Sequence, residues 1–171
     1  MSYTGNLGEA SAQYRPVAAV RTLERPSSAV RFVAPGSLTR GQYGLFHWQM
    51  KPHAGGPDPH FHRTFSEAFY ILEGTVRLYD GARWVHANGG DFIYVPEGGV
   101  HAFGNDTDAD ASMLILFAPG VARERYFEEL AEIGASGRRL TPGEWTELYA
   151  RHDQYMVQGD EISEPQGRPT G

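Results

Sequence analysis

The sequence predicts an all-β domain of the sandwich or jelly-roll type, followed by two short helices. From about residue 29 to residue 118, short apolar runs alternate with turn residues. Many short strands at such a spacing are typical of sandwiches and jelly rolls. After Pro119-Gly120 the apolar period changes to that of a helix. A chain of 171 residues is long enough for one domain with a substantial core.

The apolar runs predict nine strands, which the glycine and proline positions separate. Asp80-Gly81 predicts a two-residue hairpin turn. Asn88-Gly89-Gly90 and Pro96-Glu97-Gly98 predict two further turns, because Gly accepts a positive φ and Pro fixes its own. The expected strands are residues 29–33, 44–50, 59–62, 67–73, 75–79, 83–87, 91–95, 100–103 and 113–117.

Two helices are expected after the strands. Residues 122–133 place Tyr126, Leu130 and Ile133 on one face at a helical period. The segment Thr141-Pro142-Gly143-Glu144 has the spacing of a capping box, with Pro at the first helical position. It therefore predicts a second helix at about 142–151.

Composition excludes several classes of function. The net charge of −6 gives no bulk attraction to nucleic acid or to an anionic membrane surface. The absence of Cys excludes disulfides, thiolate ligands and Cys nucleophiles. The start of the chain lacks the pattern of a signal peptide, and no run of about 18 apolar residues is present. We therefore expect a cytoplasmic protein.

Three histidines and one glutamate stand in two blocks rich in Gly and Pro. His60, His62 and Glu67 lie in the first block, and His101 lies in the second. Residues two apart on a strand point to the same face, so His60 and His62 can point to the same place. Glu67 and His101 lie on other predicted strands and can point there too. Three imidazoles and a carboxylate suit a divalent transition metal.

Two other interpretations of these residues remain open. The histidines could be separate core or surface residues, or the His and Glu side chains could bind a ligand directly without a metal. Four protein ligands would leave open positions on a metal for water, a chelating substrate or dioxygen, and Glu67 could accept a proton from a bound hydroxyl.

The two blocks resemble the two motifs of the cupin superfamily. The first fits at His60, His62, Glu67 and Gly74, and departs at Ala54, where the family pattern has Gly. The second fits at all its fixed positions, which are Gly90, Pro96, Gly98, His101 and Asn105. Residues after the β region, Ala118-Pro119-Gly120 and 123–130, resemble the helical cap of small bacterial quercetin 2,3-dioxygenase-like monocupins.

The resemblance implies a double-stranded β-helix, a jelly-roll variant, with one metal deep in one mouth. The implied ligands are His60, His62, Glu67 and His101, and Asn105 would be structural. The metal would be Fe, Mn, Ni, Co, Cu or Zn, because these ligands do not select among them. The chain then divides into an N-terminal arm (1–28), a cupin β-barrel (29–118), a helical extension of the same domain (119–158) and a tail (159–171).

The alternation of side chains along the strands predicts the wall of the pocket. If Glu67 points inward, Phe69 and Ile71 do so too, and Phe103 follows His101. On strand 44–50 we favour the face of Phe46, Trp48 and Met50 over the face of Leu45, His47 and Gln49. The predicted wall is apolar and aromatic, which suits a planar or hydrophobic substrate.

Three functions fit this ligand set and wall. The first is a quercetinase-like dioxygenase that acts on a planar enol or hydroxyl-ketone, flavonol-like substrate with dioxygen, with Glu67 as the catalytic base. The second is a metal-dependent cyclase, isomerase or lyase acting on a polyketide-like intermediate. The third is a non-enzymatic cupin that binds a small molecule. We also expect a homodimer, because edge strands of jelly rolls tend to be paired or covered.

Overall fold

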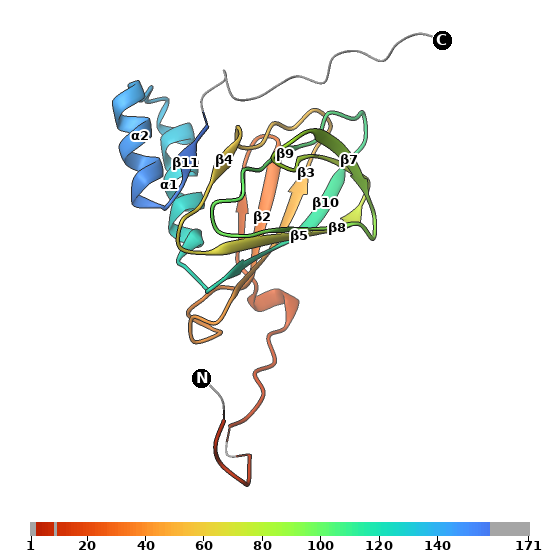
Figure 1. The fold of residues 1–171 in the computed structure, drawn as a ribbon, viewed down its shortest axis with the longest axis vertical. Coiled ribbons are helices and arrows are strands. Elements are labelled where there is room, and N and C mark those ends of the chain that lie inside the picture. The colour runs from red at the N-terminus through yellow and green to blue at the C-terminus, as the bar shows by residue number, and fades with distance from the viewer. Residues whose placement is uncertain (1–2, 9, 158–171) are drawn as a thin grey trace.

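The computed structural model describes residues 3–8 and 10–157 (Figure 1). The expected tail at 159–171 lies outside these residues. A single 3-10 turn, η1 (Val17–Ala19), precedes the first strand. The strands are β1 (Thr22–Glu24), β2 (Ser28–Ala34), β3 (Gly44–Met50), β4 (His60–Phe61), β5 (Ser66–Glu73), β6 (Thr75–Tyr79), β7 (Trp84–Asn88), β8 (Phe92–Val95), β9 (Ala102–Gly104), β10 (Ala111–Ala118) and β11 (Tyr155–Met156).

The strands form three antiparallel sheets with jelly-roll character. The large sheet has the order β1-β2-β3-β10-β5-β8, and two smaller sheets have the orders β7-β6-β9 and β11-β4. The expectation of a closed barrel was wrong. Strand β6 pairs with β7 and β9, and β4 pairs with β11. Neither small sheet is therefore joined to the large sheet by a ladder of backbone hydrogen bonds. In Figure 1 the smaller sheets lie across from the large sheet and enclose the interior.

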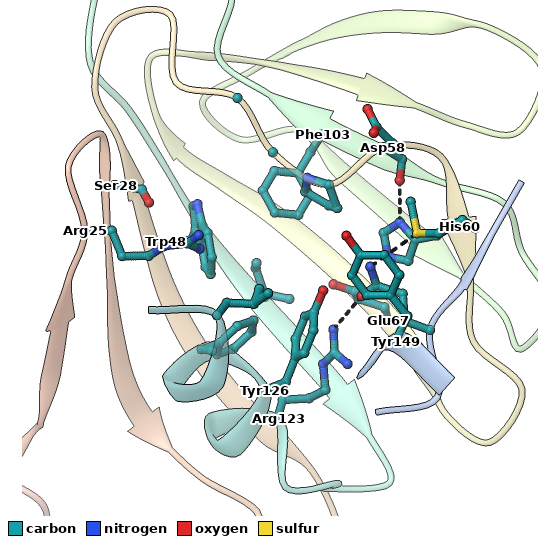
Figure 2. Close-up of a pocket in the computed structure, with 18 of the residues that line it drawn as sticks. Arg25, Ser28, Trp48, Asp58, His60, Glu67, Phe103, Arg123, Tyr126 and Tyr149 are labelled. Atoms are coloured by element: carbon teal, nitrogen blue, oxygen red, sulfur yellow. Dashed lines mark hydrogen bonds between the residues drawn. The ribbon is translucent and has the colours of Figure 1, made fainter. Parts of the chain in front are cut away.

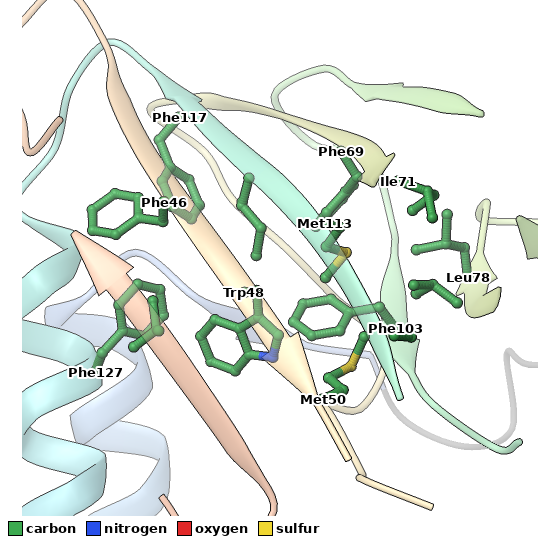
Figure 3. Packing of buried hydrophobic residues seen from close by; sticks show 14 of the residues in the cluster. Phe46, Trp48, Met50, Phe69, Ile71, Leu78, Phe103, Met113, Phe117 and Phe127 are labelled. Atoms are coloured by element: carbon green, nitrogen blue, oxygen red, sulfur yellow. The ribbon is translucent and has the colours of Figure 1, made fainter. Parts of the chain in front are cut away.

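The core lies between the sheets and follows the alternation of the strands. On β3, Phe46, Trp48 and Met50 are buried, so the favoured face is the one that points inward. On β5, Phe69 and Ile71 are buried on the same face as Glu67. Figure 3 shows these side chains packed together with residues of β6, β9 and β10. The side-chain period of two therefore fixes which residues reach the interior.

The turn after β6 is longer than predicted. The sequence indicated a two-residue hairpin at Asp80-Gly81, but the strands β6 and β7 are joined by residues 80–83. The carboxylate of Asp80 accepts hydrogen bonds from the backbone N–H groups of Ala82 and Arg83, both at 2.9 Å. These side-chain hydrogen bonds stabilise the longer connection in place of the predicted two-residue turn.

Two helices follow the strands and lie beside one end of the large sheet (Figure 1). Helix α1 (Arg123–Ser136) runs three residues beyond the predicted end and stops at Gly137, whose φ is 69°. Helix α2 (Pro142–Arg151) begins at the predicted capping box of Thr141 and Glu144. Among the described residues, neither helix is long and apolar enough to cross a bilayer.

Candidate metal centre

His60 and His101 are held side by side by the backbone. His60 lies at the start of β4 and forms an isolated antiparallel bridge with His101, which directly precedes β9. The N–H of each residue donates to the carbonyl of the other, at 3.0 and 2.9 Å. His60 and His101, forty-one residues apart in the sequence, therefore bring the two blocks together at one β-bridge. Their ring centroids are 4.3 Å apart.

The other two members of the set come from β5 and from the end of β4. Glu67 lies on the inward face of β5, and His62 follows β4. Ligand atoms from His60, His62, Glu67 and His101 all lie within 4.8 Å of one another, and all four residues are buried. The structure thus brings together the four residues that the sequence singled out.

Each imidazole is oriented by a backbone carbonyl. Nδ1 of His60 lies 2.8 Å from the carbonyl oxygen of Asp58, and Nδ1 of His101 lies 3.0 Å from that of Gly99. Nδ1 of His62 lies 2.5 Å from the carbonyl oxygen of Asp153. A carbonyl only accepts hydrogen bonds, so each Nδ1 carries a proton and donates it. In the neutral ring the lone pair then stands on Nε2, the arrangement that typically supports metal ligation.

The charges at the centre are coupled. Burial raises the pKa of Glu67, but the charge and hydrogen bond of His101, together with His62, outweigh burial and hold that pKa below its usual range. Burial also lowers the pKa of His101, yet Glu67 raises it above its ordinary value. Burial, followed by the neighbouring His101 and His62, lowers the pKa of His60. Glu67 is therefore ionised, and His60 is neutral near neutral pH.

The donor set fits a divalent cation. Oε2 of Glu67 lies 2.9 Å from Nε2 of His101 and 3.2 Å from Nε2 of His62. A proton on Nε2 of His101 satisfies the first contact, but Nε2 of His62 is buried and makes no hydrogen bond. When the Nε2 lone pair of a neutral imidazole faces a carboxylate oxygen, the two groups repel each other. A cation bound between them removes that repulsion. The residues present therefore suit a metal with nitrogen and oxygen ligands.

A segment far along the chain completes the centre. The strand β11 pairs with β4, with Met156 opposite His60 and Tyr155 opposite Phe61. Just before β11, Asp153 supplies the carbonyl that orients His62. Sequence reasoning missed this segment, because the two-residue strand leaves no periodic pattern and Asp153 carries no motif.

A cavity of about 330 Å³ opens beside the centre (Figure 2). His60 and Glu67 line it, together with Trp48 and Phe103 from the predicted wall. Phe46, Met50, Phe69 and Ile71, also predicted for the wall, do not line this cavity and are buried in the hydrophobic core beside it. The lining also includes residues from the C-terminal region, which are Arg123, Tyr126, Phe127, Leu130, Trp145, Tyr149, Gln154 and Met156.

The remaining histidines stay outside the centre. His53 contacts Asp108 at 2.8 Å, and His86 contacts Asp106 at 3.1 Å. His152 contacts Glu129, and His47 is half-buried. Asn105, the last residue of the second motif, has a structural role. Its amide donates to the carbonyls of Lys51 and Ala109, and its Oδ1 accepts from the N–H of Thr107.

Gly56, two residues after the departure at Ala54, is a position in this block where a side chain would not fit. A Cβ on Gly56 would lie 1.9 Å from the carbonyl oxygen of Phe103, whereas a Cβ on Gly55 would meet nothing within 4 Å. The close approach of backbones beside the centre thus requires glycine at position 56.

Comparison with known families identifies the β region. The sequence profile of the Cupin domain family matches residues 46–117, which contain all four members of the cluster. Residues 46–117 are therefore similar to the Cupin domain family. The match runs from β3 to β10, so the helices and β11 lie outside the shared domain.

One curated relative is similar to this chain over part of its length. Quercetin 2,3-dioxygenase of Bacillus subtilis is 32% identical over 73 residues, which are 43% of this chain but 21% of the relative. The chain thus matches about a fifth of that protein.

Solved structures share the fold. KdgF from a Halomonas species superposes with a TM-score of 0.55 at 15% identity, over 64% of this chain and 94% of that chain. The polyketide cyclase RemF from Streptomyces resistomycificus superposes with a TM-score of 0.53 at 20% identity, over 63% of this chain and 80% of that chain. At these identities the likeness shows the jelly-roll fold alone.

Proposed function

We propose that this chain is a metal-dependent cupin enzyme, and that it is a quercetinase-like dioxygenase acting on a planar enol or hydroxyl-ketone, flavonol-like substrate. The observation that carries the proposal is the position of Glu67 and His60. Both belong to the buried four-residue cluster, and both line a cavity whose wall is aromatic. The partial similarity to a quercetin 2,3-dioxygenase points to the same chemistry.

His60, His62, Glu67 and His101 would hold one divalent transition metal among Fe, Mn, Ni, Co, Cu and Zn. When bound, such a metal supplies Lewis-acid polarisation of a substrate oxygen and, for redox-active metals, electron transfer. The three carbonyl-bound Nδ1 groups hold the rings in one orientation, so little reorganisation is needed on binding.

Glu67 would accept the proton of the substrate hydroxyl. Its Oε2 faces the centre, and the carboxylate is ionised near neutral pH, so it can receive a proton. Trp48 and Phe103 would hold a planar ring, since their own rings meet edge to face with centroids 5.7 Å apart and form one wall. Tyr126 and Phe127 of α1 border the same space and would exclude water.

The proposal is tested by oxygen uptake with a flavonol, using protein loaded separately with each candidate metal. The expected result is uptake of oxygen matched by a ring-cleaved product of higher mass, and its loss in His60→Ala. A product of unchanged mass without oxygen uptake would instead indicate a cyclase or isomerase. Tight binding without turnover for every metal would indicate a binding protein, and either result overturns the dioxygenase.

A further inference from the structure

Arg123 is a buried cation on the wall of the cavity. It is the first residue of α1, its exposed fraction is 5%, and it lines the same cavity as Glu67 (Figure 2). Its guanidinium donates to the carbonyl oxygen of His152 at 2.9 Å and to Oε1 of Gln154 at 3.2 Å. Among the described residues no carboxylate lies within 4.0 Å of it, and its buried Nε has no hydrogen-bond partner.

Aromatic rings keep this guanidinium in place. It lies 4.2 Å from the ring centroid of Tyr126 and between 5.4 and 5.6 Å from those of Phe65, Phe117 and Phe127. Such contacts favour the charged form of Arg in a dry environment. Burial lowers its pKa, but an arginine side chain stays protonated in proteins, so a full positive charge faces the cavity.

The charges in the cavity do not balance. A divalent metal bound by three neutral imidazoles and the Glu67 carboxylate leaves one positive charge, and Arg123 adds a second. The other charged residues of the lining are Arg25, which is partly exposed, and Asp58, which is exposed. These two have opposite signs and are screened by water. An excess of buried positive charge is costly unless an anion enters.

We propose that Arg123 is an anion-recognition residue, and that the substrate of this protein carries an ionised oxygen, either a carboxylate or an ionised enol, which lies between the metal and the guanidinium. The hydroxyls of Tyr126 and Tyr149 are further donors on this wall (Figure 2). Burial raises the pKa of Tyr126 to about 12, so its hydroxyl keeps its proton and can donate. This substrate class rests on the metal site of the proposed function.

The test measures binding rather than turnover. The full chain, loaded with Zn²⁺ and checked for zinc by elemental analysis, is titrated calorimetrically with naphthoate and with its neutral isostere naphthamide. A second pair, lawsone and its methyl ether, presents an ionised enol and its neutral counterpart. We expect at least one anion to bind about tenfold or more tightly than its neutral partner, since hydrogen bonds to charged groups are strong. The pair that shows the preference identifies the source of the ionised oxygen.

Three variants assign the preference to Arg123. Arg123→Gln removes the charge. Gln154→Glu leaves Arg123 in place and neutralises it, because Oε1 of Gln154 already accepts its hydrogen bond. Both are expected to lose most of the preference. Arg125→Gln removes the same charge from an exposed position of the same helix and should keep the preference. Thermal melting identifies any variant that fails to fold. If Arg123→Gln fails to fold, Gln154→Glu still tests the proposal.

The outcomes separate this inference from the proposed function. Anion affinities within about twofold of wild type in Arg123→Gln and Gln154→Glu, with and without zinc, overturn the role of Arg123. An absence of any anion preference in the wild type does so too. Failure to bind zinc overturns the metal site, and the titrations of the metal-free protein then still report on Arg123. Missing oxygen uptake with the anion preference intact overturns only the dioxygenase.

Discussion

The carbonyl oxygen of Asp153 accepts a hydrogen bond from Nδ1 of His62 at 2.5 Å, across a separation of ninety-one residues. The side chain of Asp153 contacts the same loop, because its carboxylate accepts from the N–H groups of Arg63 and Thr64 at 3.0 and 2.8 Å and from Oγ1 of Thr64 at 2.7 Å. A segment outside the cupin domain match therefore positions one of the four clustered residues.

Asp153→Ala is expected to weaken metal binding without touching a ligand. It removes three hydrogen bonds to a charged acceptor and should lower the free energy of unfolding by about 1–3 kcal/mol. Asp153 has a φ of 52°, a conformation that Asn tolerates. Asp153→Asn is therefore the matched control and should lose less zinc affinity and less stability than Asp153→Ala. Zinc titration and urea denaturation measure both effects. Unchanged zinc affinity in the Ala variant would show that the loop holds His62 unaided.

His62→Ala is expected to lose the metal outright. Its Nε2 is buried, has no hydrogen-bond partner and belongs to the four-residue cluster, so the substitution removes one of the four ligand residues. Elemental analysis of the purified variant measures the loss. His86→Ala is the control, since His86 is exposed and contacts Asp106 away from the cluster. Stoichiometric metal in His62→Ala would remove this residue from the ligand set.

Glu67→Gln is expected to reduce turnover more than metal affinity. The amide oxygen of Gln can still ligate a metal, but it cannot take a proton from a substrate hydroxyl. Metal content and oxygen uptake, measured on the same preparation, separate the two effects. An equal loss of both would argue that Glu67 only binds metal.

The contact between Glu129 and His152 predicts a stability that depends on pH. The hydrogen bond from His152, with the hydrogen bond and charge of Arg151, outweighs the opposing effect of burial and holds the pKa of Glu129 below its usual value of 4.5. A depressed carboxyl pKa contributes stability above the unfolded pKa, and that stability is lost as pH falls through the folded pKa. Urea denaturation should therefore show Glu129→Gln to be less stable than wild type at neutral pH. The difference should shrink in acid, and a constant difference would contradict the linkage.

Substitutions of Phe69 and Trp48 are expected to affect different properties, stability for Phe69 and ligand affinity for Trp48. Phe69 packs in the core and does not line the cavity, so Phe69→Leu should lower the free energy of unfolding by about 1 kcal/mol and leave naphthoate affinity unchanged. Trp48 lines the cavity, so Trp48→Phe should weaken naphthoate binding through lost contact area. Denaturation and calorimetry on both variants measure this. A lower naphthoate affinity in Phe69→Leu would show that Phe69 belongs to the wall of the cavity after all.

The homodimer stays a prediction. The outer face of β5 and β8 exposes Tyr70, Leu72, Phe92 and Tyr94, and β8 is an edge of the large sheet. Sedimentation measures the oligomeric state.

Much of the fold could be predicted because local chemistry decides it. Strand β3 has the predicted bounds of 44–50, and its buried residues alternate along the face that the sequence favoured. Helix α2 starts at Pro142, directly after its N-cap Thr141, because the capping box acts within four residues of chain. The prediction of a two-residue turn at Asp80-Gly81 was wrong, because a hydrogen bond to the side chain of Asp80 competed with the preference of Gly for a tight turn.

The sequence by itself determined most of the strand pattern, though not β11, and the His60, His62, Glu67 and His101 set, because both follow from residue type and spacing along short segments. Only the tertiary structure decided that the sheets do not close, that Asp153 orients His62, and that Arg123 is a buried cation in the cavity. These features depend on contacts between residues far apart in the chain, and no local periodicity or motif records where such residues meet.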